Sequence, residues 1–132
     1  GEAGSVSSIN YVKNGIAGML ENVPREKLIG GVPFYTRLWT EAGDGTITSK
    51  AMGIAEEKRW VDNNQVELTW QADTAQYYGE VQTSDGAQFL WMEEERSLKE
   101  KMNVIRQNDL AGVACWKLGF EDSAAWDSIQ WN

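Results

Sequence analysis

Two short segments of this chain share one pattern, and that pattern constrains the fold more than any other feature of the sequence. Residues 27–39 and 109–119 each contain an apolar run with glycine inside it, and each run leads into an aromatic residue beside a cation. A helical pattern of apolar residues precedes each segment. Parallel strands buried on both faces have this composition. The pair therefore predicts two parallel strands in an α/β fold, with carboxyl ends that open onto a ligand site.

The residues between the two segments predict an antiparallel insertion. Ser49 is placed to cap a helix over residues 50–63. Alternating apolar residues and a turn at Ser84-Asp85-Gly86 then predict a three-stranded meander. Its expected strands cover residues 66–70, 76–82 and 87–92. A helix that begins at Glu94 or Glu95 leads into the second parallel strand.

Composition excludes several classes of function. The formal charge of −8, without a basic run, argues against nucleic acid and against an anionic membrane surface as partners. Without histidine, the chain cannot build a Ser-His-Asp or Cys-His site, and it lacks the commonest metal ligand. Cys115 alone allows neither an internal disulfide nor a zinc knuckle. We expect no metal and no cofactor.

The residues that follow the two predicted strands are the candidates for binding a ligand. They are Phe34, Tyr35, Arg37 and Trp39 after the first strand, and Trp116, Lys117 and Glu121 after the second. Aromatic rings offer flat faces to the apolar side of a sugar, and the Arg37 guanidinium offers a planar pair of donors. Alternatively, the aromatic residues fill the core and Arg37 forms a surface ion pair. The residue types alone favour neither alternative.

Three consecutive glutamates, Glu93, Glu94 and Glu95, are a candidate pair of acid and base. Neighbouring residues on a helix point in different directions, which does not suit two carboxylates acting on one bond. Acidic residues also favour the first turn of a helix, because they interact with its dipole. We therefore interpret these glutamates as a solvated helix start, and we assign no catalytic residue.

Three motifs together resemble glycoside hydrolase family 18, the chitinase-like family, and most of all its spore-cortex and cell-wall-lytic branch. They are Gly-Val-Pro-Phe-Tyr-Thr-Arg at residues 31–37, Trp-Met-Glu-Glu-Glu-Arg-Ser-Leu at residues 91–98 and Gly-Val-Ala-Cys-Trp-Lys-Leu-Gly at residues 112–119. The resemblance implies strands seven and eight of a (β/α)8 TIM barrel, with an inserted antiparallel α+β subdomain. On this basis residues 1–40 and 94–132 form the partial barrel, and residues 41–93 form the insertion.

The resemblance also implies a function. The family cleaves β-1,4 bonds next to N-acetylglucosamine in chitin or peptidoglycan, and the acetamido oxygen of the sugar acts as nucleophile. By matching position, Trp116 would form the floor beside the scissile bond, and Tyr35 and Arg37 would line the groove. Trp39 is a further candidate sugar platform, and Thr36 replaces a usual glycine.

The chain departs from the family pattern in one decisive respect. The DxxDxDxE motif that carries the catalytic acid does not occur in the sequence. The resemblance therefore implies the C-terminal portion of a secreted, cell-wall or spore-associated glycosidase, inactive alone, whose partner is an N-acetylglucosamine-containing polysaccharide. A non-catalytic carbohydrate-binding domain and a purely structural α+β domain are the alternatives. We also expect self-association, because two parallel strands alone leave edges exposed.

Overall fold

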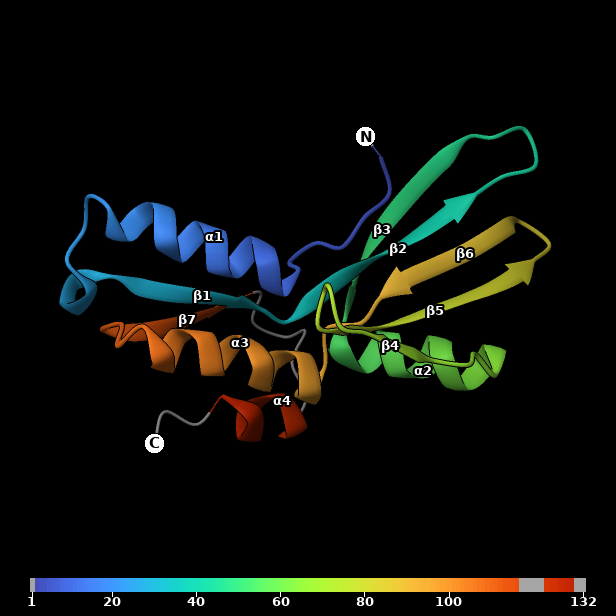
Figure 1. The fold of residues 1–132 in the computed structure, drawn as a ribbon. Helices are drawn as coiled ribbons and strands as arrows, with labels where there is room; N and C mark the ends of the chain where they lie inside the picture. Colours follow the sequence, from blue (N-terminus) through green and yellow to red (C-terminus); the bar gives the residue numbers. More distant parts are fainter. Residues whose placement is uncertain (1, 117–122, 130–132) are drawn as a thin grey trace.

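The structure is a computed structural model that describes residues 2–116 and 123–129. Figure 1 shows two lobes, one with most of the helices and one dominated by a twisted sheet. The elements are, in chain order, α1 (Ile9–Leu20), a 3-10 turn (Arg25–Lys27), β1 (Ile29–Pro33), β2 (Tyr35–Glu41), β3 (Ile47–Gly53), α2 (Ile54–Asn64), β4 (Thr69–Gln71), β5 (Gln76–Thr83), β6 (Gly86–Trp91), α3 (Glu95–Gln107), β7 (Gly112–Trp116) and α4 (Ser123–Ser128). Among the described residues, no helix is long and apolar enough to cross a membrane.

The two predicted parallel strands are confirmed. β1 pairs with β7 in parallel, from Ile29 opposite Gly112 to Pro33 opposite Trp116. α1 and α3 run alongside these strands (Figure 1), and the apolar residues of both helices pack against them in one core. Gly30 lets α3 approach closely, because a Cβ atom at this position would lie 2.7 Å from the Ile105 side chain.

The second sheet is larger than the predicted meander. It has five strands in the order β3-β2-β6-β5-β4, and each neighbouring pair is antiparallel. The helix predicted over residues 50–63 is wrong at its start, because residues 47–53 form β3 and α2 begins only at Ile54. The backbone of β3 pairs with β2 along its whole length, and this long-range pairing prevails over the capping tendency of Ser49.

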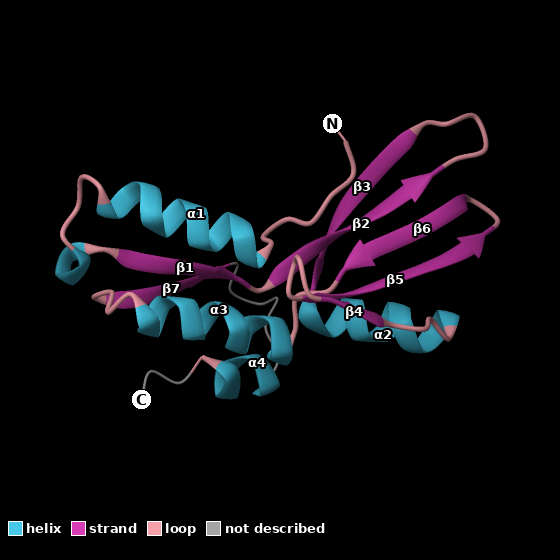
Figure 2. Cartoon of the chain, in the orientation of Figure 1, coloured by secondary structure: helices cyan, strands magenta, loops and turns pink. Residues whose placement is uncertain are grey.

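The two faces of the five-stranded sheet differ. α2 lies along one face (Figure 2), where Trp60 packs with side chains from three strands. The strand residues of this core are Leu38, Met52 and Leu90, and Met92 follows β6 directly. Since side chains alternate along a strand, the residues between these positions point to the opposite face. That face, called the open face below, carries most of the aromatic residues of β2, β5 and β6, and Gly4 and Ser5 of the N-terminal segment contact it at Trp39 and Gln76.

The division into residues 1–40 with 94–132 and residues 41–93 stays a prediction. The hydrogen bonding adds one fact to it, namely that β2 belongs to the five-stranded sheet. The polypeptide passes from the parallel sheet into the antiparallel sheet at Phe34, which is fully buried. It returns between β6 and α3, where Glu94 caps the helix by accepting hydrogen bonds from the backbone N–H groups of Arg96 and Ser97. The two sheets are therefore joined at two points.

Candidate functional site

The resemblance assigns four residues to sugar binding, and three of them lie on one strand. Tyr35, Arg37 and Trp39 alternate along β2, so all three point to the open face of the five-stranded sheet. We expected them in a loop after the carboxyl end of a parallel strand. They do follow β1 in the chain, but they are not in a loop. The structure places them in a strand of the second sheet, whereas Phe34, an additional candidate, is in the core.

Each of these three side chains has defined surroundings. Tyr35 lies at the end of a cavity of about 640 Å³ between α1 and β1. The Arg37 Nε donates a hydrogen bond to Ser49 Oγ at 2.9 Å, and the Trp39 Nε1 donates to the backbone oxygen of Gly4 at 3.1 Å. These bonds hold the arginine and the indole at the sheet surface. Arg37 forms no ion pair among the described residues, so the alternative of a surface ion pair is not supported.

Trp116 ends β7, and its backbone pairs with Pro33. Tyr35 follows Pro33 by two residues, so the backbones of Trp116 and Tyr35 lie close together at the carboxyl end of the parallel sheet. The side chain of Trp116 lies outside the described part of the structure, as do Lys117 and Glu121. The structure therefore brings together the strand ends that carry the predicted residues, and the orientation of Trp116 stays a prediction.

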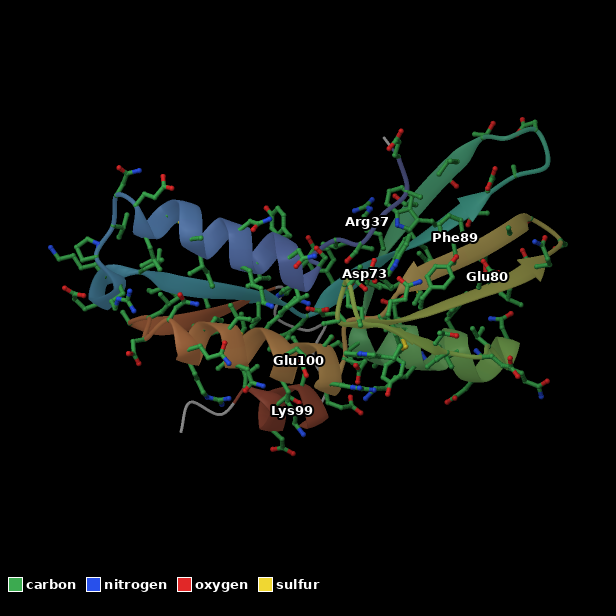
Figure 3. The ribbon with its side chains drawn as sticks, in the orientation of Figure 1. Arg37, Asp73, Glu80, Phe89, Lys99 and Glu100 are labelled. Carbon is green, nitrogen blue, oxygen red and sulfur yellow. The ribbon has the colours of Figure 1, made fainter. Side chains whose placement is uncertain are left out.

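A cluster of aromatic residues on the same face was missed by the sequence analysis. Tyr78 on β5 lies opposite Trp91 on β6, with ring centroids 5.1 Å apart, and Phe89 lies 6.0 Å from Trp91. Phe89 is also the register partner of Trp39. Figure 3 labels Arg37, Phe89 and Glu80 on the neighbouring strands β2, β6 and β5. The alternation within β5 and β6 is visible in the sequence, but the strand order that unites them with β2 is not.

Polar contacts fix the rings of this cluster. Trp91 Nε1 donates to Gln71 Oε1 at 2.9 Å, and the Tyr78 hydroxyl donates to Glu80 Oε2 at 2.9 Å. Partial burial, and secondarily this bond to Glu80, raise the pKa of Tyr78 to about 12. The hydroxyl therefore stays protonated throughout the physiological range. Phe89 and Trp91 are half-buried.

The glutamates before α3 are not a solvated helix start, as the sequence suggested. Glu93 and Glu94 are buried, and only Glu95 is substantially exposed. Lys101 Nζ lies 2.7 and 2.8 Å from the two Glu93 carboxylate oxygens, and Gln76 and Ser97 also donate to Glu93. Burial raises the pKa of Glu93, while Lys101 and these hydrogen bonds lower it in part.

A further buried carboxyl joins this cluster from α2. Glu57 Oε1 accepts a hydrogen bond from the backbone N–H of Glu93 at 2.8 Å, whereas Oε2 has no partner. Desolvation raises the pKa of Glu57 well above its usual range, and the charges of Glu93 and Glu94 raise it further. These carboxyls are shielded from solvent. Their arrangement fits a structural junction between α2, β6 and α3.

Comparison with known proteins gives a consistent result. The profile of glycosyl hydrolases family 18 matches residues 4–121. The uncharacterized glycosylase YvbX of Bacillus subtilis is 26% identical over 131 residues, which cover 98% of this chain and 38% of that protein. A cortical fragment-lytic enzyme of the same organism is 26% identical, over 92% of this chain and 29% of the enzyme.

The solved structure of a chitinase from Chromobacterium violaceum superposes with a TM-score of 0.88 at 21% identity, over 98% of this chain and 40% of the chitinase. At that identity the likeness shows the fold alone. The chain thus spans well under half the length of each of these three proteins.

Proposed function

Because the chain belongs to glycosyl hydrolase family 18, we propose that it forms part of the sugar groove of an enzyme that hydrolyses β-1,4 bonds at N-acetylglucosamine. The observation that carries this proposal is the common orientation of Tyr35, Arg37 and Trp39 on the open face of β2. They follow directly on the carboxyl end of β1, the end at which barrel enzymes bind their substrates.

Each residue has a role that its chemistry suits. Tyr35 and Trp39 present ring faces to the apolar side of a pyranose, and Arg37 donates hydrogen bonds to hydroxyl or acetamido oxygens. The bond from Arg37 to Ser49 holds the guanidinium in place before a sugar binds. Trp116, at the end of the neighbouring strand β7, would supply the floor of the same groove. The chitin or peptidoglycan substrate, the exo or endo mode of cleavage and these roles are all part of the proposal.

The chain alone is proposed to be inactive. Its sequence lacks the DxxDxDxE motif, and its buried carboxyls are held by Lys101 and by a backbone N–H group. The acid that protonates the leaving oxygen would then come from other parts of the barrel. A relative whose name describes the lysis of cortical fragments supports action on cell-wall material and a secreted or spore-associated location for the whole protein.

A second candidate is a carbohydrate-binding domain without catalysis. The observation that favours it is the aromatic open face of the five-stranded sheet, which has its own core against α2. Under this alternative, the chain binds an amino-sugar polymer, and it stays inactive even when it is joined to the rest of a barrel enzyme.

A chimera distinguishes the two candidates. This chain would replace the matching 124 residues of the Bacillus subtilis cortical fragment-lytic enzyme, and hydrolysis of a chromogenic chitobiose and of cortex fragments would be measured. The proposal predicts turnover by the chimera and none by the chain alone. In the chimera, Arg37→Ala should lower kcat/KM at least tenfold, while Arg59→Ala, at an exposed arginine of α2 on the other side of the sheet, should not change it.

Two results would contradict the proposal. One is a chimera that circular dichroism shows to be folded but that turns over neither substrate. This result would favour the carbohydrate-binding domain without catalysis. The other is robust turnover by the isolated chain, because it would show that the catalytic acid lies within these residues.

A further inference from the structure

Thr36 stands in the first motif where the family usually has glycine, and the proposed function gives it no role. We propose that Thr36 is a positioning residue, whose hydroxyl joins β2 to the end of β6 and holds the groove residues of β2 at a fixed distance from Trp91. The joint between the two strands rests on the geometry below. Its effect on hydrolysis rests on the proposed function as well.

The Thr36 side chain acts from behind the groove. Thr36 lies between Tyr35 and Arg37 on β2, so its side chain points to the opposite face of the sheet. It is only 2% exposed, and its register partner on β3 is Met52, which belongs to the core that α2 covers. Any influence of Thr36 on the groove therefore passes through the backbone of β2.

The backbone pairing of β2 with β6 stops short of this position. It ends at Trp39 opposite Phe89, whereas β2 pairs with β3 along its whole length. The same register, continued by two residues, would place Arg37 opposite Trp91. Within these two described strands, Arg37 and Trp91 are not paired. The ladder between β2 and β6 therefore ends directly beside the groove residues.

The Thr36 hydroxyl supplies the contact that this ladder lacks. Met92 donates its backbone N–H to the oxygen of Tyr77 on β5 at 2.7 Å. Since the C=O and N–H of one peptide group point in opposite directions, the Trp91 carbonyl points away from β5 and toward β2. Thr36 Oγ1 donates to this carbonyl oxygen at 2.6 Å, within the normal range for an O–H···O bond. The threonine side chain thus satisfies a backbone acceptor that would otherwise be costly to leave without a partner.

Two further bonds hold neighbouring side chains toward opposite edges of the sheet. Arg37 Nε donates to Ser49 on β3, and Trp91 Nε1 donates to Gln71 on β4. In the strand order β3-β2-β6-β5-β4, these two partners lie on opposite sides of the β2–β6 pair. Arg37 and Trp91 are therefore held apart, and their separation depends on how firmly β2 and β6 are joined. Thr36 makes that joint.

A threonine that only fills the core would have a different signature. Loss of its hydroxyl would then lower the stability of the whole fold and affect every protected backbone amide equally. A joint between two strands instead predicts a local effect, because only the end of the ladder would open. Two variants separate these alternatives. Thr36→Val keeps the shape of the side chain and removes the hydroxyl, whereas Thr36→Ser keeps the hydroxyl.

Native-state hydrogen exchange of the isolated chain tests the joint. In Thr36→Val, the backbone amides of Trp39 and Phe89, the last pair of the ladder, should exchange about tenfold faster, as expected for one lost hydrogen bond. The amide of Ile105 in α3 should not change, and Thr36→Ser should exchange like the wild type. Thr40→Val is the matched control, because Thr40 lies on the same face of β2 and forms no side-chain hydrogen bond among the described residues.

Turnover by the chimera tests the effect on the groove. Thr36→Val should lower kcat on the chromogenic chitobiose about tenfold, because displaced groove residues hold the sugar out of line with the catalytic acid. KM should change less than about threefold, since every ring and donor of the groove is still present. Thr36→Ser and Thr40→Val should keep the kcat of the unmodified chimera.

The proposal is overturned if Thr36→Val leaves the exchange of Trp39 and Phe89 unchanged, or if it accelerates the exchange of Ile105 equally. It is also overturned if Thr36→Ser behaves like Thr36→Val, or if an active chimera keeps its kcat with Thr36→Val. Failure of the proposed function looks different. A folded but inert chimera, together with faster local exchange in Thr36→Val, would refute that function alone.

Discussion

The two sheets of this protein are stabilised in different ways. The parallel half, made of α1, β1, α3, β7 and α4, places small strand residues against helices, and Ile29 of β1 is 59% exposed. The antiparallel half, made of β2 to β6 and α2, has its own core around Trp60 and Leu90. An antiparallel sheet can expose one face to solvent, whereas a parallel sheet is normally covered on both. The comparison suggests that the antiparallel half is the more self-sufficient of the two.

The largest expected effect on stability concerns the junction between α2, β6 and α3, where the two halves meet and Glu57, Glu93 and Lys101 are buried. Lys101→Met removes the cation that pairs with Glu93 and leaves a buried carboxylate without a counter-charge. We expect a loss of about 3–5 kcal/mol in the free energy of unfolding. Urea unfolding would measure it, with Lys99→Met on the exposed side of α3 as control. A loss no larger than that of the control would mean that the junction does not couple the halves.

The next effect belongs to the parallel half. Gly30→Ala places a Cβ atom 2.7 Å from the Ile105 side chain, and the resulting shift of α3 should cost about 1–3 kcal/mol. Gly15→Ala on α1 meets nothing within 4 Å and should instead stabilise the protein by about 0.5–1 kcal/mol. Thermal unfolding would report both changes. Equal effects would show that the packing of α3 on β1 is looser than the structure indicates.

The pH dependence of stability tests the antiparallel side of the junction. The raised pKa of Glu57 means that the folded protein binds a proton more tightly than the unfolded chain does. Its stabilising contribution is therefore complete at low pH and is lost as the pH rises through the folded pKa. Glu57→Gln keeps the acceptor for the Glu93 N–H but cannot ionise. The free energy of unfolding, measured with urea at several pH values, should vary less with pH for this variant than for the wild type. An unchanged dependence on pH would contradict a buried, protonated Glu57.

The smallest change in stability is expected from a substitution at the exposed edge of β1, which should nevertheless change self-association strongly. We predict that the chain self-associates through the edge of β1, since that strand pairs only with β7 among the described residues. Ile29→Lys should yield a monomer in light scattering and change the free energy of unfolding by less than about 0.5 kcal/mol. Leu68→Lys, an exposed apolar position on the antiparallel half, should not alter association. A monomeric wild type at high concentration would refute the prediction.

The sequence was sufficient to predict the parallel pair, because glycine-containing apolar runs leave few alternatives to buried strands. It was insufficient for β3, where the cap signal of Ser49 is local and the pairing with Leu38 and Trp39 is not. The burial of Glu93 was missed for the same reason, since Lys101 and Gln76 approach it only after α3 and β5 have packed. The aromatic cluster of Tyr78, Phe89 and Trp91 was missed because its rings come from two strands whose order relative to β2 is set by the whole sheet.

The most direct test of glycan binding on the open face is a map of amide chemical shifts as the isolated chain is titrated with the N-acetylglucosamine tetramer. We predict changes on the open face, at Arg37, Phe89 and Trp91, and none on α2, which covers the opposite face of the sheet. Shifts confined to α1 or α2, or no shifts at a concentration where calorimetry detects binding, would contradict the claim that this face contacts the glycan.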